Sequence, residues 1–346
     1  MILSEKEKIP EIQSMLVIHQ GALGDFILAL PVLSALRGAF PEARPVMMGY
    51  PRILQLVEER FYAEEIFSID QKGMATFFVR QGPLDWALSQ FFSTFELIVV
   101  FGKDGAGTLI GNLKRVCQGR IFHINPLPNW DEGVHLSDHL LKQLTRYGIS
   151  LSETNPRLHL RESDREWGRN FWMKRGLNPE ERSNVIILHP GSGSRKKVWP
   201  LKKYLDLFRH LQTQLGGKFL IVLGPAEGPE IQQAFEELTS PHLIPAEGLS
   251  LVQLASVMEG CRLFIGNDSG ISHMAVALRL PTIAIFGPTD HRVWSPRGEK
   301  VEVVRRGIPC SPCAEERFFL CKEFECLNRI ELGDVLKSLR SMEAEV

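Results

Sequence analysis

Short apolar runs alternate with longer segments of helical periodicity along this chain, and the alternation restarts halfway. Runs rich in β-branched and other apolar residues predict strands at 15–20, 44–50, 65–69 and 97–102, and again at 184–191, 218–224, 262–266 and 281–287. Apolar residues at helical spacing predict helices at 26–38, 200–216, 228–239, 250–259, from 269, and at 331–342. A polar, proline-bearing stretch at 148–164 separates the two series. The pattern predicts two α/β domains, each with a parallel sheet.

The composition fits this organisation. The 346 residues exceed one typical domain, and 44% are hydrophobic and 23% charged, as in ordinary globular proteins. The formal net charge of -1 gives no general attraction for nucleic acid, so no nucleic-acid partner is expected. The longest apolar segments, such as 97–101, are too short to cross a bilayer, and the charged first residues lack the apolar core of a signal peptide. We therefore expect a cytoplasmic protein.

Ligands of parallel α/β sheets bind beyond the carboxyl ends of the strands, so the loops after predicted strands are the candidate sites. The first is HQGALGD at 19–25. Gly21 and Gly24 allow tight turns and a close approach of the backbone to a ligand. Asp25 follows them, either as the cap of the next helix or as an acid that acts on a ligand. The spacing is not the GxGxxG of dinucleotide-binding proteins.

The second candidate loop is HPGSGSRKKVWP at 189–200. Small residues, among them Ser192 and Gly193, offer backbone amides, and three cations follow at 195–197. Amide donors and positive charges are a suitable lining for a phosphate, although a solvated run of charge has the same sequence. The spacing excludes a Walker loop.

Two further loops follow strands in the second half. Glu227 comes just after a strand end. A carboxylate there either accepts hydrogen bonds from ribose hydroxyls or is simply an exposed acid in a turn. In the loop FIGNDSGISHMAVAL at 264–278, Asp268 or Ser269 caps a helix whose first amides, near Gly270, are a ready pyrophosphate site. His273 lies one turn further on, as a ligand to the same anion or as a capping or core residue.

Four of the six cysteines are close together near the C-terminus, at 310, 313, 321 and 326. Their C-x2-C-x7-C-x4-C spacing permits a metal cluster, but it is looser than that of a zinc ribbon. Reduced thiols that brace a loop are the interpretation we favour, so no metal site is predicted.

Taken together, four segments resemble glycosyltransferase family 9, the lipopolysaccharide heptosyltransferases, which have the GT-B fold. The segments extend from about residue 15 to 330 and are GALGDFILALPVLSALRGAFP, HPGSGSRKKVWP, GNDSGISHMAVALRLPTIAIFGPTD and the closing CSPC…C…CLNRI. Each segment alone is a weak signal, whereas their ordered combination is specific.

The resemblance implies two Rossmann-like, doubly wound domains that face each other across a cleft. Residues 1–158 would bind the acceptor, 159–330 would bind the nucleotide sugar, and the helix in 331–346 would pack toward the N-terminal domain. The implied reaction is an inverting, metal-independent transfer from an ADP-sugar, such as ADP-L-glycero-D-manno-heptose, to a glycolipid. It needs no cofactor, and the acceptor implies transient contact with the inner membrane.

The resemblance also implies roles for single residues. Asp25 would be the catalytic base, on an acceptor-side loop with Gly21 and Gly24. The implied donor-binding residues are Lys197, with Ser192 and Gly193 in the same loop, Glu227, Asp268, Ser269, Gly270 and His273. Inversion needs a base on the face opposite the leaving group, and Lys197 with the helix amides would stabilise the departing diphosphate. A carboxylate near a helix N-terminus is expected to have a lowered pKa.

Two other functions fit the same loops. A nucleotide-sugar 2-epimerase of GT-B-like fold would form its product from the donor alone. A non-catalytic module would bind the nucleotide sugar without transferring it. The chain also departs from the family pattern at His19 and Gln20, where many members carry Arg or another polar residue.

Overall fold

The computed structural model describes residues 11–128, 133–149, 153–224, 227–238, 240–313 and 315–344. Contacts divide these residues into two units. The first holds residues 11–21, 29–128 and 136–149 with the short stretch up to Thr154. The second holds 22–28, 133–135 and the described residues from Asn155 onward. The last change of unit along the chain falls between Thr154 and Asn155.

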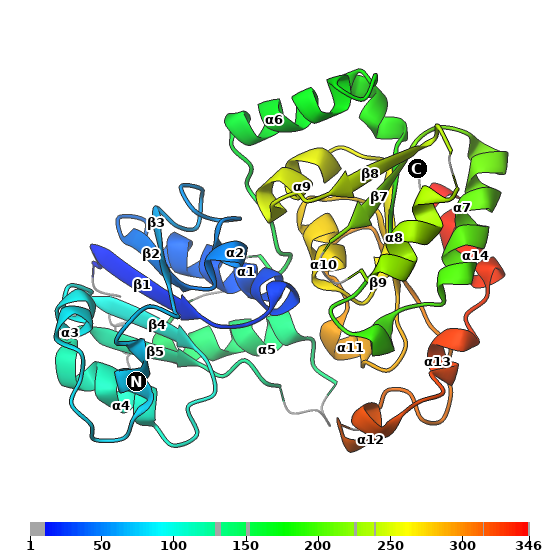
Figure 1. Ribbon diagram of the computed structural model, residues 1–346. Helices are drawn as coiled ribbons and strands as arrows, with labels where there is room; N and C mark the ends of the chain where they lie inside the picture. Colours follow the sequence, from blue (N-terminus) through cyan, green and yellow to red (C-terminus); the bar gives the residue numbers. More distant parts are fainter. Residues whose placement is uncertain are drawn as a thin grey trace, which may run out of the picture. The chain divides into compact units, whose positions relative to one another are not determined.

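The first unit is built on a five-stranded parallel sheet (Figure 1). Its strands are β1 (Ser14–His19), β2 (Arg44–Gly49), β3 (Glu65–Ser68), β4 (Leu97–Phe101) and β5 (Arg120–Ile124). The order is β3-β2-β1-β4-β5, so the chain returns to the other side of β1 after β3. The strand order therefore reverses between β1 and β4, which is the place where ligands bind in such sheets.

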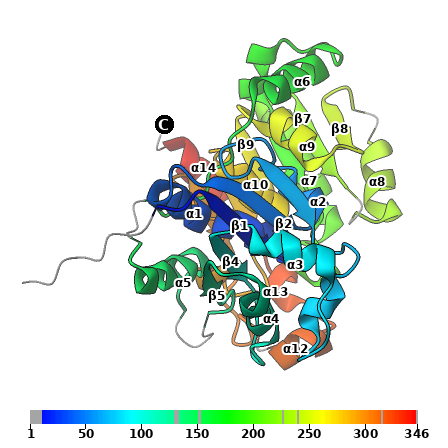
Figure 2. The same cartoon turned by 90° about the vertical axis from the view of Figure 1, so that its left-hand side faces the viewer.

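Helices cover both faces of this sheet (Figures 1 and 2). They are α1 (Leu23–Ala39), α2 (Pro51–Leu54), η1 (Met74–Phe78), α3 (Trp86–Ser93), α4 (Thr108–Val116), α5 (Leu136–Lys142) and η3 (Gln143–Tyr147). On one face, Leu16 and Ile18 of β1 share a core with Phe92 of α3 and Leu113 of α4. All four side chains are fully buried, and each such burial contributes roughly 1.5–3 kcal/mol.

The second unit contains a six-stranded parallel sheet with the order β11-β10-β9-β6-β7-β8. Its strands are β6 (Ile186–His189), β7 (Phe219–Leu223), β8 (Leu243–Glu247), β9 (Leu263–Asn267), β10 (Thr282–Ile285) and β11 (Val301–Val304). Here the order reverses between β6 and β9. The two sheets confirm the predicted fold class of two doubly wound, parallel α/β domains.

The helices of the second unit also lie on both faces of the sheet, with α7 and α14 on one and α9 and α10 on the other (Figure 1). They are α6 (Glu162–Met173), η4 (Pro179–Asn184), η5 (Arg195–Lys197), α7 (Leu201–Leu215), α8 (Pro229–Glu236), α9 (Leu251–Met258), α10 (Gly270–Ala277), α11 (His291–Trp294), α12 (Glu315–Leu320), α13 (Glu325–Asn328) and α14 (Leu332–Ala344). Val335, Leu339 and Met342 of α14, the helix expected to pack toward the N-terminal domain, belong to the core of the second unit. Among the helices of the described residues, none has the length and hydropathy of a membrane span.

Candidate active site

The loops after β6, β9 and β10 meet where the strand order of the second unit reverses. Asn267, the last residue of β9, joins two of them through a fully buried side chain. Its Nδ2 donates to the carbonyl oxygens of Pro190 (2.8 Å) and Gly191 (3.1 Å), and its Oδ1 accepts from the Trp199 N–H at 3.0 Å. Asn267 thereby fixes both ends of the cationic loop. The sequence analysis did not identify Asn267 as a functional residue. The one feature that could have indicated it is a side-chain amide at the end of an apolar strand.

Lys197 is the cation of this loop that points toward the β9 end. Its Nζ lies 2.9 Å from Oδ2 of Asp268, a buried carboxylate. Thr289, in the loop after β10, donates its hydroxyl to the same oxygen, and the Ser192 hydroxyl donates to the Asp268 carbonyl at 2.7 Å. Three loops that were predicted separately are thus joined around Asp268.

The two other cations of the loop have different surroundings. Lys196 Nζ donates to the carbonyl oxygens of Phe318 (2.7 Å) and Phe319 (2.6 Å) in α12. Arg195 is exposed, as is Gly193, which has open space where a side chain would be. Lys197 is therefore the cation of the loop that is paired with the site.

Glu227 is buried, so the interpretation as an exposed turn is wrong. Its Oε1 accepts from His189 Nε2 at 3.1 Å, and its Oε2 accepts from the Gly224 N–H. Burial alone would raise the pKa of Glu227, but the hydrogen bond and charge of His189 and the Gly224 N–H together lower it. The carboxylate lies against Gly191, where a Cβ would be 1.5 Å from Oε1. On the other side of the ring, His189 Nδ1 is 3.2 Å from the Ser269 hydroxyl.

Ser269 caps α10, as the sequence predicted as one alternative. Its side chain accepts from the Ser272 N–H, and its backbone is extended, with φ -153°. Within the described residues, no acceptor is found for the N–H groups of Gly270 and Ile271. A Cβ on Gly270 would be 2.7 Å from Leu23 Cβ, so this glycine is needed for packing. The start of α10 therefore keeps two free amide donors, which is the usual basis of anion binding at a helix N-terminus.

His273 is buried one turn further along α10, with its Cδ2 3.2 Å from where a Cβ on Gly24 would lie. Burial lowers the pKa of His273 to about 4, so the imidazole is neutral near pH 7. Its Nδ1 is buried without a hydrogen-bond partner among the described residues. Buried polar atoms are nearly always paired, so this nitrogen is an expected contact for a ligand group.

Asp25 lies in the first turn of α1, within the segment 22–28 that contacts assign to the second unit. Because α1 begins at Leu23, Ala22 precedes the helix and Asp25 does not occupy the cap position. Its Oδ2 accepts instead from the Ala22 N–H at 3.1 Å. No hydrogen bond to Oδ1 is found among the described residues. One carboxylate oxygen thus stabilises the helix start, and the other is free to accept a proton.

The expected lowering of the Asp25 pKa is wrong. Burial raises this pKa, and the Ala22 N–H and the positive charge of Lys197 oppose the change only in part. The sequence suggested the opposite because it showed the helix start and not the burial. A raised pKa makes the ionised form of Asp25 a stronger base than an ordinary aspartate.

His19 supports the turn before Asp25. Its buried Nδ1 accepts from the Gly21 N–H at 3.2 Å, and its ring packs against Phe101 with centroids 5.3 Å apart. Burial lowers the pKa of His19 to about 4. Gln20, next to it, is half-buried. The position where the chain departs from the family pattern therefore carries a neutral ring that shapes the turn.

The four C-terminal cysteines line one small cavity of about 90 Å³. Among the described residues, none of the four forms a disulfide, and burial raises the pKa of Cys326 to about 11. In the part of the chain that the structure describes, no three His, Cys, Asp or Glu side chains are arranged to hold a metal ion.

Comparison with known proteins supports the interpretation of the four segments. The family described as "Glycosyltransferase family 9 (heptosyltransferase)" matches residues 126–322. A lipooligosaccharide heptosyltransferase 2 of Campylobacter jejuni subsp. jejuni serotype O:6 is 31% identical, over 92% of this chain and 96% of its own length. The lipopolysaccharide heptosyltransferase 3 of Escherichia coli (strain K12) is 24% identical, over 80% of this chain and 83% of its own.

A solved structure agrees in fold over nearly the whole chain. The ADP-heptose lipopolysaccharide heptosyltransferase II of Escherichia coli superposes with a TM-score of 0.73 at 18% identity, covering 96% of this chain and all of the other. At that identity, the likeness establishes the fold alone. The family match over more than half of the sequence, and the 31% identity to a full-length relative, show that this chain is a glycosyltransferase that belongs to family 9, the heptosyltransferase family.

Proposed function

We propose that this enzyme transfers a heptose from ADP-heptose to the inner core of lipopolysaccharide, with inversion and without a metal ion. The names of its relatives support the sugar and the acceptor. The observation that carries the proposal is the grouping of a half-buried acid, Asp25, with the Lys197–Asp268 pair and the free amides of α10 in one unit. A glycolipid acceptor would bring the protein to the cytoplasmic face of the inner membrane, where it would act as a peripheral enzyme.

The donor diphosphate would bind at the start of α10. The N–H groups of Gly270 and Ile271 would donate to it, and Lys197 would supply positive charge beside Asp268. The leaving group gains negative charge during transfer, and fixed amide dipoles with one ammonium stabilise that charge without a divalent ion. Ser192 and Gly193 would border the diphosphate, and Glu227 would orient the nucleoside from the β7 loop.

Asp25 would act as the general base. The acceptor oxygen forms a bond to the anomeric carbon while the bond from that carbon to the β-phosphate oxygen breaks. The hydroxyl proton passes to Asp25 Oδ1, and the electron pair of the broken bond leaves with ADP. Attack from the face opposite the diphosphate inverts the configuration. The neutral imidazole of His273, with its unpaired Nδ1, would hydrogen-bond a sugar hydroxyl.

Replacing the base separates chemistry from binding. Asp25→Ala should reduce transfer by about 10²- to 10⁴-fold while ADP-heptose binding stays within a few-fold, because the acid would act on the acceptor. The matched control is Asp206→Ala, a surface acid on α7, which should transfer at the wild-type rate. Substantial turnover by Asp25→Ala would rule out the base assignment.

A thermal-shift panel tests the donor. ADP-heptose should raise the melting temperature more than GDP- or UDP-sugars, and transfer should continue in EDTA. A preference for another nucleotide would overturn the donor proposal, and loss of activity in EDTA would overturn the metal-free mechanism. Product formed from donor alone would instead indicate an epimerase.

A further inference from the structure

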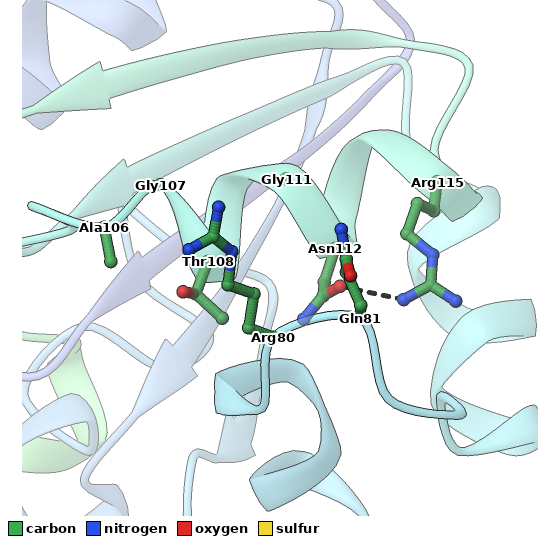
Figure 3. Close-up of a pocket in the computed structure, with 8 residues that line it drawn as sticks. All are labelled: Arg80, Gln81, Ala106, Gly107, Thr108, Gly111, Asn112 and Arg115. Atoms are coloured by element: carbon green, nitrogen blue, oxygen red, sulfur yellow. Dashed lines mark hydrogen bonds between the residues drawn. The ribbon is translucent and has the colours of Figure 1, made fainter.

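The first unit contains a cavity of about 470 Å³ that the proposed donor site does not use. It is a groove between α4 and the segment that precedes α3, and Figure 3 shows the residues that line it. Arg80 lies over the Thr108 end of α4, and Arg115 lies at the far end. The volume falls within the range of about 300–1,000 Å³ that is common for small-molecule sites.

Hydrogen bonds from α4 hold the opposite wall of the groove in place. The buried Asn112 Nδ2 donates to the carbonyl oxygens of Phe77 (2.9 Å) and Val79 (3.0 Å). Arg115 Nη1 donates to Gly82 O at 3.1 Å and to Asn112 Oδ1 at 2.9 Å. The segment 77–82 is therefore fixed at three carbonyl groups.

The floor of the groove has no side chains to fill it. Gly107 caps α4 and Gly111 lies within it, and apart from their chain neighbours and the helix's own backbone, no heavy atom is found within 4 Å of where their Cβ atoms would be. Gly107 has φ +65°, a conformation that other residues rarely adopt. Two glycines one turn apart thus leave a flat strip of backbone, onto which a sugar ring can stack without a steric clash.

The groove has positive charge and no acid among its lining residues. Arg80 is exposed and makes no hydrogen bond or ion pair with any described residue. Arg115 uses only Nη1 within the described part of the chain, so its other nitrogens face outward as donors. The amides of Leu109 and Ile110 at the start of α4 are already bonded to Asp104. Of the available donors, the two guanidinium groups are the charged ones.

The topology puts one end of the groove, at Ala106, Gly107 and Thr108, at the ligand-binding edge of the sheet. The loop from β4 leads directly into α4, and β4 lies beside β1 at the reversal of strand order. β1 in turn leads into the turn before Asp25. Parallel sheets bind ligands beyond the carboxyl ends of the strands at this reversal.

We propose that this groove binds a phosphate-bearing saccharide, with Arg80 and the Thr108 hydroxyl on the phosphate and the sugar over Gly107 and Gly111. Arg115 donates to a second anionic or hydroxyl group of the same saccharide. Guanidinium groups pair with phosphate through two parallel hydrogen bonds, so an arginine can fix the orientation of the phosphate. The inference rests on the proposed function in taking a glycan as acceptor, and it identifies the acceptor as phosphorylated.

Calorimetric binding tests the groove without any transfer. The probes are a phosphorylated inner-core saccharide, the same saccharide after phosphatase treatment, and inorganic phosphate. We expect Arg80→Gln and Arg115→Gln to weaken binding of the phosphorylated form by about 10- to 100-fold and to leave binding of the treated form unchanged. Lys114→Gln, which removes a charge from the same turn but outside the groove, should bind like wild type. Equal binding of both saccharides, an equal loss in Lys114→Gln, or binding of inorganic phosphate as tight as that of the saccharide would overturn the proposal.

Kinetics distinguish this inference from the proposed function. Arg80→Gln should raise KM for the phosphorylated acceptor by about 10- to 100-fold, with kcat and the KM for ADP-heptose within about 2-fold. Because Arg80 is exposed and makes no hydrogen bond or ion pair with a described residue, its replacement should leave the melting temperature unchanged. Efficient transfer with the same KM for both saccharides would refute the groove and leave the proposed function standing. Phosphate-dependent binding without any heptose transfer would support the groove and refute the proposed function.

Discussion

The two oxygens of the Asp25 carboxylate differ in their hydrogen bonds. Oδ2 accepts from the Ala22 N–H and stabilises the first turn of α1. Oδ1 has no such partner among the described residues, and burial raises the pKa of the group as a whole. The helix therefore fixes the orientation of the side chain without using both of its acceptors. This arrangement suits a base that must meet a hydroxyl in one geometry.

The raised pKa predicts how transfer depends on pH. As the pH falls, Asp25 takes up its proton before an ordinary aspartate would, so kcat/KM should decline at a pH clearly above about 4. The measurement is kcat/KM for the acceptor across the acid range at saturating donor. An activity that remains flat down to the pKa of an ordinary carboxyl group would contradict the base assignment.

The raised pKa of Asp25 also predicts how the stability of the fold depends on pH: where activity rises with pH, the contribution of Asp25 to stability falls. A carboxyl whose pKa is higher in the folded than in the unfolded state binds more protons when folded, so its contribution to stability falls as the pH rises between the two pKa values. Asp25→Asn should therefore melt no lower than wild type near pH 7, although we expect it to lose activity. Below the unfolded pKa, where both states are protonated, that advantage should disappear.

At the scale of elements, the cationic loop at 189–200, which we propose binds the donor, depends on one side chain of β9. Asn267 makes hydrogen bonds to both ends of the segment 190–199, and the Trp199 indole donates to Ile330 O at 3.0 Å behind it. The loop is thereby fixed to the sheet on one side and to the segment before α14 on the other. Lys197 can hold its position beside Asp268 because the chain around it cannot shift.

Removing that anchor should affect stability and nucleotide binding together. Asn267→Ala leaves buried backbone groups without partners, and we expect a loss of about 2–4 kcal/mol in the free energy of unfolding and weaker binding of ADP. The matched control is Asn112→Ala, which removes an equally buried amide from the first unit. Both variants should be less stable in urea, but only Asn267→Ala should lose ADP affinity. Unchanged ADP affinity in Asn267→Ala would refute this role.

The sequence predicted the interior of both sheets and missed part of their edges. The central strands β1, β4, β6 and β7 are continuous apolar runs, because both of their faces are covered. β5, β8 and β11 were not predicted, and each is an edge strand with partly exposed residues or, in β8, a proline. Exposure breaks the apolar run that identifies a strand, so single-sequence reasoning is weakest there.

Site prediction had a similar limit. The loops that contain Asp25, Lys197, Asp268 and Ser269 could be selected because each follows a predicted strand, and the resemblance to the family then singled out Asp25 and Lys197. The partnerships of His189 with Glu227, and of Asn267 with the cationic loop, join residues far apart in the chain. Such pairings depend on the strand order, which the local pattern does not contain. The pKa of Asp25 was misjudged for the same reason, since burial is a tertiary property.

At the scale of the whole molecule, each unit has its own reversal of strand order and its own candidate ligand site. The residues proposed to bind the donor, with Asp25, belong to the second unit, and the groove beside α4 belongs to the first. The two substrates of a transferase would thus be recognised by different sheets.

Hydrogen exchange with each substrate alone tests this division. ADP should slow exchange at 190–200 and 266–274 and leave 77–82 and 106–115 unchanged, because a ligand stabilises the segments that it contacts. The phosphorylated saccharide should give the opposite pattern. Lys197→Gln with ADP is the control and should show reduced protection of the second unit. Protection of the groove by ADP alone would contradict the separation of the two sites.

The contact between Gly191 and Glu227 has an evolutionary consequence. The carboxylate fills the space that any side chain at position 191 would need, and its hydrogen bonds to His189 and Gly224 prevent it from moving aside. Substitutions at positions 191 and 227 are therefore expected to be coupled. We therefore expect a side chain at position 191 to be tolerated better where Glu227 is replaced by a smaller residue.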